Sequence, residues 1–349
     1  MKIFLTGAAG LLGGEMAHRL LTAGHSVTGL VRNGRGILSN GGQAVPARDF
    51  NGDIPAAGEM AILPGDVSAA GLGLDAAAQK ALSGQIDLVL HCAAVTDFNA
   101  SEEVYRAVNI GGVQNIAALF SAQRILHVST AYVCGLKNGA VAEQPRDDAF
   151  GFANGYEQSK AAGEGIVRAT GKRAVIARPS IILGTYEEGC LRSFDTFYQA
   201  FRLIAEGQIT KLPASPDATL DFVPIDHVAG GLMDIIKHWD NAAGQTIHLS
   251  SGSPVSMTML ADAIGHFAHL HRPELVAPAD FCPTKLPPLE RRLYRHVAAF
   301  YSSYFQRSPL FETACLAAIG GRICPPMDAN ALARMIAYCI ARGFIRSPD

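Results

Sequence analysis

The sequence has few charged residues and no excess of either sign. Lys and Arg number 29 against 31 Asp and Glu, and charged residues make up 17% of the chain. Without a strongly basic surface, little attracts the chain to nucleic acid or to an anionic membrane. The composition therefore favours a small organic substrate.

The sequence also lacks paired cysteines and long apolar runs. Its seven cysteines are an odd number with no C-x-x-C pair, which argues for a reducing compartment and against a disulfide frame or a cysteine-rich zinc site. No apolar run approaches the roughly 18 residues of a membrane helix. The start, "MKIFLTGAAG", turns to glycine too early for a signal peptide. These absences predict a cytoplasmic protein with no integral membrane segment.

What the sequence does contain is an alternation of short apolar strands with longer helical patterns over residues 1–185. This alternation is typical of a doubly wound parallel sheet. Strands are predicted at 2–6, 26–31, 60–63, 87–92, 125–129 and 174–178. Helices are predicted at 11–22, 74–82, 101–122 and 156–169. The sequence thus predicts a Rossmann-type α/β fold.

The rest of the chain is less regular. Residues 33–58 are rich in Gly, Pro and Asn, and we expect a long surface excursion that frames one side of a cofactor cleft. Residues 220–251 contain a helical and a strand pattern that are expected to return to the sheet. Residues 186–219 and 252–349 are predicted to form a smaller C-terminal substrate-binding lobe.

A glycine-rich turn follows the first predicted strand and opens the first predicted helix. Gly7, Gly10 and Gly13 form it together with Leu11 and Leu12. At this position the first glycine permits a tight turn, the second leaves room for a pyrophosphate, and the third lets helix and strand pack closely. These five residues are predicted to bind a dinucleotide.

The end of the second predicted strand indicates which dinucleotide. NAD-selective enzymes usually place Asp or Glu there, to accept from the adenosine ribose. This sequence has Val31 at that place, followed by Arg32. A guanidinium pairs well with a 2'-phosphate, so the sequence favours NADP(H) over NAD(H). A solvated arginine at a strand end is the alternative.

The stretch "GYEQSK" holds Tyr156 and Lys160 four residues apart. On a helix this spacing puts both side chains on one face. The spacing alone is equally consistent with one turn of an ordinary surface helix.

Six motifs in a fixed order give the chain a family resemblance. They are "TGAAGLLG", "HCAAVTDF", "VNIGGVQNI", "HVSTAYVCG", "YEQSK" and "RPSIILG". With them residues 1–185 resemble the extended short-chain dehydrogenase/reductase superfamily, and "LDFVPIDHVA" extends the likeness more weakly. "HVSTAYV" and "RPSIILG" look like the male-sterility-like branch, which holds fatty acyl-CoA reductases and terminal thioester-reductase domains.

The resemblance implies roles for further residues. Thr130, Tyr156 and Lys160 would be the catalytic set, with Ser129 beside Thr130 as the weaker candidate for the hydroxyl. Further cofactor contacts would come from Asp66, Val67, Ala93, Ala94, Pro179 and Ser180. Substrate contacts would come from Val95, Ser129 and Tyr132. Arg178 is equally well interpreted as an ion-pair partner at a strand end. No metal site is expected.

Hydride chemistry explains why such a set is needed. Addition of hydride to a carbonyl builds negative charge on oxygen, which a positioned O–H donor must neutralise. A free tyrosine has a pKa of about 10, and we expect the Lys160 ammonium to lower the pKa of Tyr156. Thr130 would donate a second hydrogen bond to the developing oxyanion.

The sequence therefore predicts an NADPH-dependent reductase of an acyl thioester carried by CoA or by an acyl carrier protein. One alternative is a dehydrogenase, reductase or epimerase acting on a secondary alcohol or ketone of the hydroxysteroid or sugar-nucleotide type. Another is a non-catalytic NADP sensor, which the complete Thr-Tyr-Lys set disfavours.

Two stretches carry no function by themselves. His266, His269 and His271 lie close in sequence without a carboxylate or cysteine at ligand spacing, so a chance cluster on a surface helix is favoured. Residues 289–305 mix basic and aromatic residues and are expected to form a lobe helix with one buried face. They are also the first place to look for acyl specificity.

Overall fold

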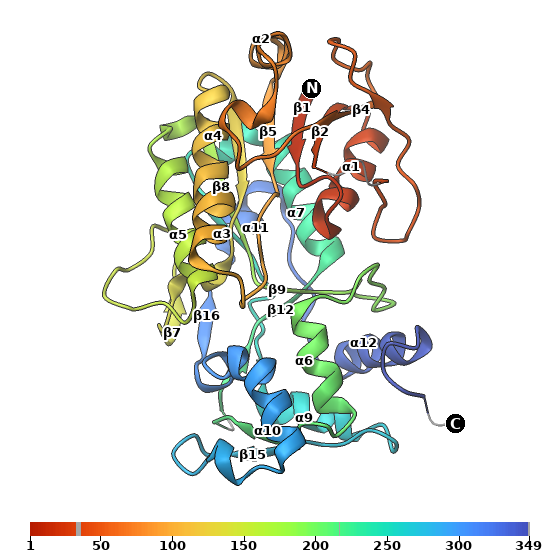
Figure 1. Cartoon of the computed structure of the whole chain (residues 1–349), viewed down its shortest axis with the longest axis vertical. Coiled ribbons are helices and arrows are strands. Elements are labelled where there is room, and N and C mark those ends of the chain that lie inside the picture. Colours follow the sequence, from red (N-terminus) through yellow and green to blue (C-terminus); the bar gives the residue numbers. More distant parts are fainter. Residues whose placement is uncertain (33–35, 216, 348–349) are drawn as a thin grey trace.

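An eight-stranded sheet forms the core of the larger half of the molecule (Figure 1). The computed structural model describes residues 1–32, 36–215 and 217–347. The strand order is β13-β8-β6-β5-β1-β2-β4-β3, and each neighbouring pair is parallel. The strands are β1 (Lys2–Thr6), β2 (Ser26–Val31), β3 (Arg48–Asp49), β4 (Met60–Pro64), β5 (Leu88–His91), β6 (Arg124–Val128), β8 (Ala174–Pro179) and β13 (Thr246–Leu249).

The predicted Rossmann-type fold is confirmed. Strands 2–6 and 26–31 have the predicted bounds, and the other four differ from prediction by no more than one residue at either end. The chain moves from β1 outward to β2 and β4, then returns to β5 on the other side of β1. This reversal opens a crevice at the carboxyl ends of β1 and β5, the usual ligand position in open α/β sheets.

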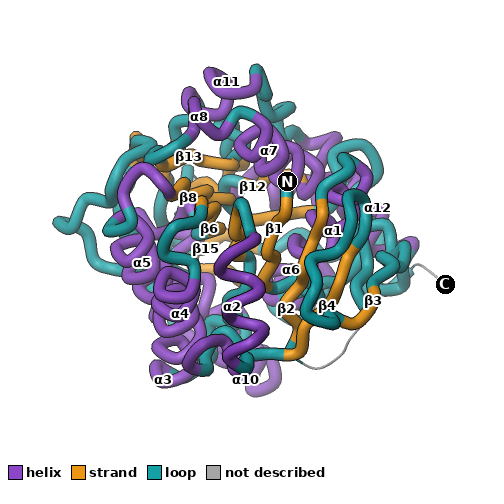
Figure 2. The backbone as a smooth tube through the Cα atoms, turned by 90° about the horizontal axis from the view of Figure 1, so that it is seen from above, coloured by secondary structure: helices purple, strands orange, loops and turns teal. Residues whose placement is uncertain are grey.

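Helices cover both faces of the sheet (Figure 2). They are α1 (Leu11–Thr22), α2 (Ala76–Gln85), α3 (Glu102–Tyr105), α4 (Gly112–Leu119), α5 (Gly155–Arg168), α7 (Ile225–Lys237), α8 (Trp239–Ala242) and α11 (Ala314–Gly320). Apolar side chains of α1, α7 and α11 share one core with the sheet. Those of α2, α4 and α5 form the core on its other face.

The helix predicted over 101–122 is interrupted by a π-helical turn, Arg106–Gly111, between α3 and α4. π-Helical turns often occur at functional sites because they redirect side chains. Here Asn109 is buried. It donates to the carbonyl of Val95 (3.0 Å) and to Ser159 Oγ (2.9 Å).

The smaller half packs around a separate apolar core. Its helices are α6 (Thr196–Ala205), α9 (Met257–Gly265), α10 (Pro288–His296) and α12 (Ala329–Ala341). Short strand pairs are β7 (Gly139–Val141) with β16 (Pro309–Phe311), β9 (Ile181–Leu183) with β12 (Phe222–Pro224), β10 (Lys211–Pro213) with β15 (Glu274–Val276), and β11 (Thr219–Leu220) with β14 (Val255–Ser256). Short helical turns of both halves together are η1 (Ala70–Gly73), η3 (Ala131–Cys134), η4 (Gly171–Arg173), η5 (Pro283–Lys285), η6 (Ala298–Tyr301) and η7 (Tyr304–Gln306); η1 and η4 lie in the connections of the large sheet.

Two parts of the chain differ from expectation in detail. The segment 36–58 is not only a surface excursion, because Ile37, Asn40 and Val45 are buried and β3 extends the edge of the sheet; residues 33–35 lie outside the described residues. The segment 252–349 includes α11, which packs against α7 and β13. The domain bounds drawn from the sequence remain a prediction.

A buried ion pair joins the C-terminal part of the chain to α5. Arg307 Nη2 lies 2.6 Å from Glu157 Oε1, and both side chains are almost inaccessible to solvent. Arg307 also donates to the carbonyl of Gly135 and lies over the rings of Tyr132 and Tyr304. The pair therefore fixes the segment 301–311 against the helix that carries Tyr156 and Lys160.

Replacing Arg307 should destabilise the whole fold. Arg307→Met leaves the Glu157 carboxylate buried without its cation, and breaking such a pair typically costs about 3–5 kcal/mol. The free energy of unfolding from urea titration measures the effect. Arg106→Met is the matched control, because the Arg106–Glu102 pair is exposed; equal effects of the two substitutions would contradict the role given to Arg307.

Candidate active site

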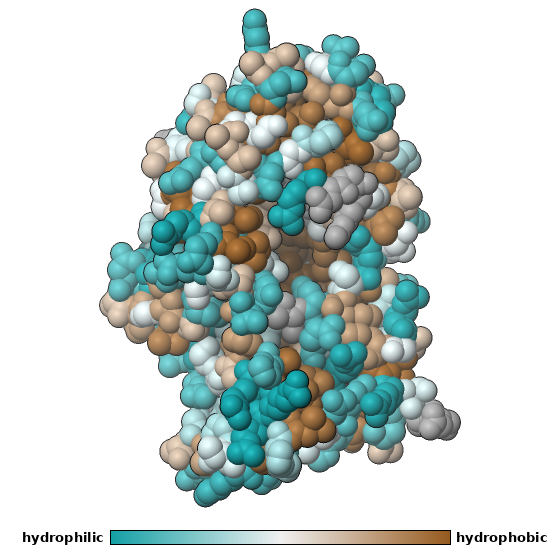
Figure 3. Space-filling model, in the orientation of Figure 1, coloured by the Kyte–Doolittle hydropathy of each residue, from teal (hydrophilic) through white to brown (hydrophobic). Residues whose placement is uncertain are grey.

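A cavity of about 410 Å³ opens where the two halves meet, at the carboxyl ends of β1 and β5. Figure 3 shows the hollow on one face of the molecule, with hydrophobic residues inside it. The described residues that line it are Gly7, Gly10, Leu11, Leu12, Gly13, Cys92, Ala94, Thr96, Phe98, Val128, Ser129, Thr130, Tyr132, Tyr156, Lys160, Pro179, Ser180, Ile181, Ile182, Ser193, Asp195, Phe197, Tyr301 and Tyr304.

The glycine-rich turn forms one wall of this cavity. Gly7 has φ +71°, and a Cβ there would lie 2.8 Å from the amide nitrogen of Ala93. A Cβ on Gly13 would lie only 2.0 Å from the carbonyl oxygen of Gly7. Both positions thus require glycine for steric reasons. Gly10, Leu11, Leu12 and Gly13 at the start of α1 line the cavity, and the start of a helix is where a pyrophosphate commonly binds.

The loop after β5 is tied to the sheet beneath it. The Ala93 amide donates to Thr6 Oγ1 (3.2 Å), and Thr6 Oγ1 is hydrogen-bonded to His91 Nδ1 (2.7 Å). His91 stacks on His127. Burial lowers the pKa of His91 to about 3 and that of His127 well below its usual value. Both imidazoles are therefore neutral, and they add no charge beneath the cavity.

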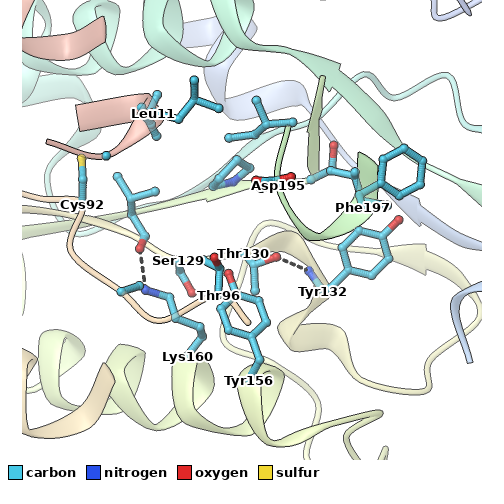
Figure 4. A pocket seen from close by; sticks show the side chains of 18 of the residues that line it. Leu11, Cys92, Thr96, Ser129, Thr130, Tyr132, Tyr156, Lys160, Asp195 and Phe197 are labelled. Atoms are coloured by element: carbon cyan, nitrogen blue, oxygen red, sulfur yellow. Dashed lines mark hydrogen bonds between the residues drawn. The ribbon is translucent and has the colours of Figure 1, made fainter. Parts of the chain in front are cut away.

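The three predicted catalytic side chains meet in the cavity (Figure 4). Tyr156 and Lys160 project from α5, and Thr130 follows β6 as the N-cap of η3. A side-chain hydrogen bond joins Thr130 to Tyr156. Lys160 Nζ donates to the carbonyl of Val128 (2.8 Å).

Burial dominates the ionisation of this set. It raises the pKa of Tyr156 well above its usual value, assisted by the charge of Glu157. It also lowers the pKa of Lys160 to about 8. The prediction that Lys160 lowers the pKa of Tyr156 is thus wrong in its net direction. The physical reason is that desolvation disfavours the phenolate. The Lys160 ammonium donates to the Val128 carbonyl and is not among the groups that shift the pKa of Tyr156 most.

Arg178 is a structural ion-pair partner. Its Nε and Nη2 lie 2.8 and 2.7 Å from the two carboxylate oxygens of Glu164, and both side chains are buried. The fork geometry suits this bidentate contact. The pair locks β8 against α5, which holds Pro179 and Ser180 at the cavity opposite Tyr156.

Several predicted cofactor and substrate residues lie outside the lining. Arg32 Nη1 is 4.0 Å from Asp66 Oδ2, and Arg32 is largely exposed. Asp66 accepts from the amide and hydroxyl of Ser68 (2.8 and 2.7 Å). Val67 is buried against Gly112. These three lie at the β2–β4 end of the crevice, where an adenosine half would extend.

Ala93 and Val95 also lie outside the lining. Ala93 is held through its amide by Thr6, and the Val95 amide donates to Asn109 Oδ1 (2.8 Å). Because Asn109 also contacts Ser159 on α5, it positions the loop after β5 relative to Tyr156. Asn109 was not singled out from the sequence, although it lies in "VNIGGVQNI".

Other site residues were also missed. Asp195 and Phe197 come from the start of α6 and Thr96 and Phe98 from the loop after β5. Tyr301 and Tyr304 come from the stretch 289–305, which forms α10, η6 and η7 rather than one continuous helix. Their contact with the cavity depends on long-range packing, which no local sequence pattern reports.

Within the described residues, no group of three or more potential metal ligands gathers at one place. His266, His269 and His271 are exposed after the end of α9, not on a helix. The described helices also include none with the length and apolarity that crossing a membrane requires.

Comparison with known proteins defines the class. A family model described as male sterility protein, an NAD-binding family, matches residues 5–232. The chain belongs to this family, and with it to the extended short-chain dehydrogenase/reductase superfamily of nicotinamide-dependent oxidoreductases, as the sequence motifs indicated.

Particular relatives refine the class. A polyketide synthase-nonribosomal peptide synthetase of Pyricularia oryzae, ACE1, is 30% identical over 67% of this chain, which is 6% of that protein. Probable fatty acyl-CoA reductase 5 of Arabidopsis thaliana is 24% identical over 54% of this chain and 49% of its own length. The chain thus spans a small part of the first relative and about half of the second.

One solved structure has the same fold over almost the whole chain. The terminal R domain of the myxalamid PKS-NRPS biosynthetic pathway aligns with a TM-score of 0.80 and 23% identity, covering 99% of this chain and 92% of that one. The likeness includes the smaller half of the molecule as well as the sheet.

The glycine-rich turn yields a stability prediction. Gly13→Ala places a methyl group against the Gly7 backbone and should lower the free energy of unfolding by about 1–3 kcal/mol. Gly165→Ala is the control, because this glycine lies in α5 with no atom within 4 Å of an added Cβ; it should stabilise the fold by about 0.5–1 kcal/mol. Urea titration compares them, and a stable Gly13→Ala would refute the close packing.

Proposed function

We propose that this protein is an NADPH-dependent reductase of acyl thioesters. The observation that carries the proposal is the meeting of Thr130, Tyr156 and Lys160 in an apolar cavity beside a glycine-rich turn. The fatty acyl-CoA reductases and synthetase proteins among its relatives support a thioester substrate, carried by CoA or by an acyl carrier protein.

The residues around the cavity fit a dinucleotide. Gly7, Gly10, Leu11, Leu12 and Gly13 would hold the pyrophosphate, because they line the cavity at the start of α1 and the three glycines let the backbone approach it closely. Arg32, Asp66 and Val67 would hold the adenosine end, with Arg32 on the 2'-phosphate. Ala93, Ala94, Pro179, Ser180 and Lys160 would contact the nicotinamide half. When bound, NADPH supplies a hydride to the substrate carbonyl carbon.

The protein's own groups would handle the charge on oxygen. The raised pKa of Tyr156 keeps the phenol protonated at neutral pH, so it can donate to the carbonyl oxygen as negative charge develops. Thr130 supplies the second hydrogen bond. Lys160, whose pKa is about 8, remains largely cationic at pH 7 and stabilises the phenolate after proton transfer.

The first reduction transfers two electrons to the thioester. Hydride addition to carbon and proton transfer to oxygen convert the thioester into a hemithioacetal. Its C–S bond then breaks, and the products are an aldehyde and the free thiol. A second NADPH would reduce the aldehyde to an alcohol by the same two transfers.

Aromatic and aliphatic residues suit the acyl chain. Phe98 lies against Tyr156, Tyr301 and Tyr304, with ring centroids 5.6, 5.2 and 5.7 Å apart. Ile181, Ile182 and Phe197 line the same cavity. Such a wall favours an apolar acyl group over a sugar. Val95, Ser129 and Tyr132 remain proposed substrate contacts.

The free thiols support one further assignment. None of the seven cysteines forms a disulfide bond among the described residues. The Cys190 thiol donates a hydrogen bond to the Tyr338 hydroxyl. We therefore place the protein in the cytoplasm, where thiols stay reduced.

Turnover assays test the proposed function. We expect the purified protein to oxidise NADPH with acyl-CoAs or S-acyl-N-acetylcysteamines, followed by the loss of nicotinamide absorbance and by aldehyde trapping. Turnover only with ketones or sugar nucleotides would replace the thioester proposal by its dehydrogenase alternative. Tight NADPH binding without turnover of any substrate would indicate a sensor.

Tyr156→Phe should abolish the chemical step while leaving cofactor binding intact. The phenyl ring keeps the packing against Phe98 but cannot donate a proton, so kcat should fall by about 10²- to 10⁴-fold. NADPH affinity, measured by fluorescence titration, should stay close to that of the unaltered protein. Full activity of this variant would exclude Tyr156 as the acid.

Arg32→Ala should change the choice of cofactor. Loss of a charge-assisted contact to the 2'-phosphate should weaken NADPH binding by about 10- to 100-fold. NADH binding should change little, because NADH has no 2'-phosphate. Titration of the unaltered protein and the variant with both cofactors measures this. Equal weakening of NADPH and NADH would show that Arg32 does not contact that phosphate.

A further inference from the structure

Asp195 stands out among the described residues that line the cavity, because it alone is acidic. It is the residue before α6, on the wall that also holds Phe197. Figure 4 shows its side chain directed into the same space as Thr130 and Tyr156. Its negative charge raises the pKa of Tyr156. The carboxylate therefore faces the space in which a group bound beside Tyr156 would lie.

Asp195 has no structural task that would explain a carboxylate. It is the N-cap of α6, yet its side chain accepts no hydrogen bond from the helix, whereas Asp75 and Asp328 cap α2 and α12 in the usual way. Among the described residues it forms no ion pair within 4.0 Å. Among the described residues, its carboxylate accepts a hydrogen bond from its own backbone amide, and its carbonyl accepts from the amide of Gln199 in α6 (3.0 Å).

The apolar surroundings of this carboxylate disfavour its charged form. Ile181, Ile182 and Phe197 line the same cavity. The Asp195 side chain is exposed to solvent in the open cavity, and partial desolvation by these walls raises its pKa to about 6. The cavity's one basic side chain among the described residues, Lys160, donates to Val128 instead. Packing a hydrocarbon chain against Asp195 would remove the remaining water at a further cost. A cation in the same place would form a charge-assisted hydrogen bond.

We propose that Asp195 forms a subsite for a protonated amine on the acyl chain, so that aminoacyl thioesters are preferred to plain fatty acyl thioesters. This inference rests on the proposed thioester reductase function. The aromatic rings of Tyr301, Tyr304 and Phe98 add a favourable surface for the ammonium group. Asp195 is thus assigned as a specificity residue.

Matched substrate pairs test the proposal. The S-N-acetylcysteamine thioesters of 3-aminopropanoate and butanoate differ by ammonium against methyl, as do those of 6-aminohexanoate and heptanoate. For the unaltered protein, kcat/KM should favour the amine of at least one pair by about 10- to 100-fold, the value of one charge-assisted hydrogen bond. Asp195→Asn should remove that preference. Asp280→Asn, which removes an exposed carboxylate outside the lining, should retain it.

Binding provides a readout that does not depend on turnover. The carbon analogues in which CH₂ replaces the thioester sulfur should show the same amine preference in calorimetric titration. The S-ethyl thioesters of the same acids lack the amide of the N-acetylcysteamine group, and they therefore serve as the control for binding of that amide by Asp195. If Asp195 instead binds an amide of the thiol carrier, Asp195→Asn will weaken all amide-bearing thioesters equally and leave the acyl preference unchanged, which overturns the proposal.

The pH dependence has a defined sign. The amine preference should disappear as the pH falls through about 6, because the Asp195 carboxyl becomes protonated while the amine stays charged. The other titratable groups of the lining or beside Asp195 are Cys92, Tyr156, Lys160, Tyr198, Tyr301 and Tyr304. Burial raises the pKa values of Cys92, Tyr156, Tyr198 and Tyr304, and the pKa of Lys160 is about 8. A preference that persists at pH 5 would contradict the assignment.

The two proposals fail differently. If no thioester is reduced, the proposed function is wrong. If thioesters are reduced but Asp195→Asn leaves the amine-to-methyl ratio unchanged, the function stands and the amine subsite is wrong. Circular dichroism and the NADPH affinity of Asp195→Asn will show whether the variant is folded.

Discussion

The buried Arg307–Glu157 pair is the contact on which the site depends. Glu157 follows Tyr156 on α5, and Arg307 follows the segment that brings Tyr301 and Tyr304 to the cavity. One ion pair thus holds the catalytic helix and the aromatic wall at a fixed separation. Because both charged groups are buried, removing either one would leave the other unpaired and would strongly destabilise the fold. The cavity is consequently a property of both halves of the molecule and belongs to neither alone.

Desolvation also determines the chemistry that the cavity favours. It keeps Tyr156 protonated, and it brings the pKa of Lys160 to about 8. The neutral His91 and His127 beneath them add no competing charge. A protonated phenol near a lysine that is still largely cationic at pH 7 suits proton delivery to a carbonyl oxygen. Among the described residues of the lining, Asp195 is the acidic one.

The sheet could be predicted well because its signals are local. Each strand is a short apolar run that ends near glycine or a polar residue, so β1 and β2 were predicted to the residue. The glycine-rich turn was likewise recognisable from spacing, and Gly7 and Gly13 lie where an added Cβ would meet backbone. The π-helical turn around Asn109 was not predicted, because the residues of a π-helical turn show the same sequence pattern as those of an uninterrupted α-helix.

By itself the sequence determined the α/β class and the glycine-rich turn, since these follow from periodicity and from backbone sterics. Its family resemblance indicated Thr130, Tyr156 and Lys160 as a candidate catalytic set. The tertiary structure decided which residues surround that set. Asp195, Tyr301 and Tyr304 are far from Tyr156 in sequence and share no spacing rule with it. It also decided the direction of the Tyr156 pKa shift, because burial depends on what packs around a phenol and not on which residues neighbour it in the chain.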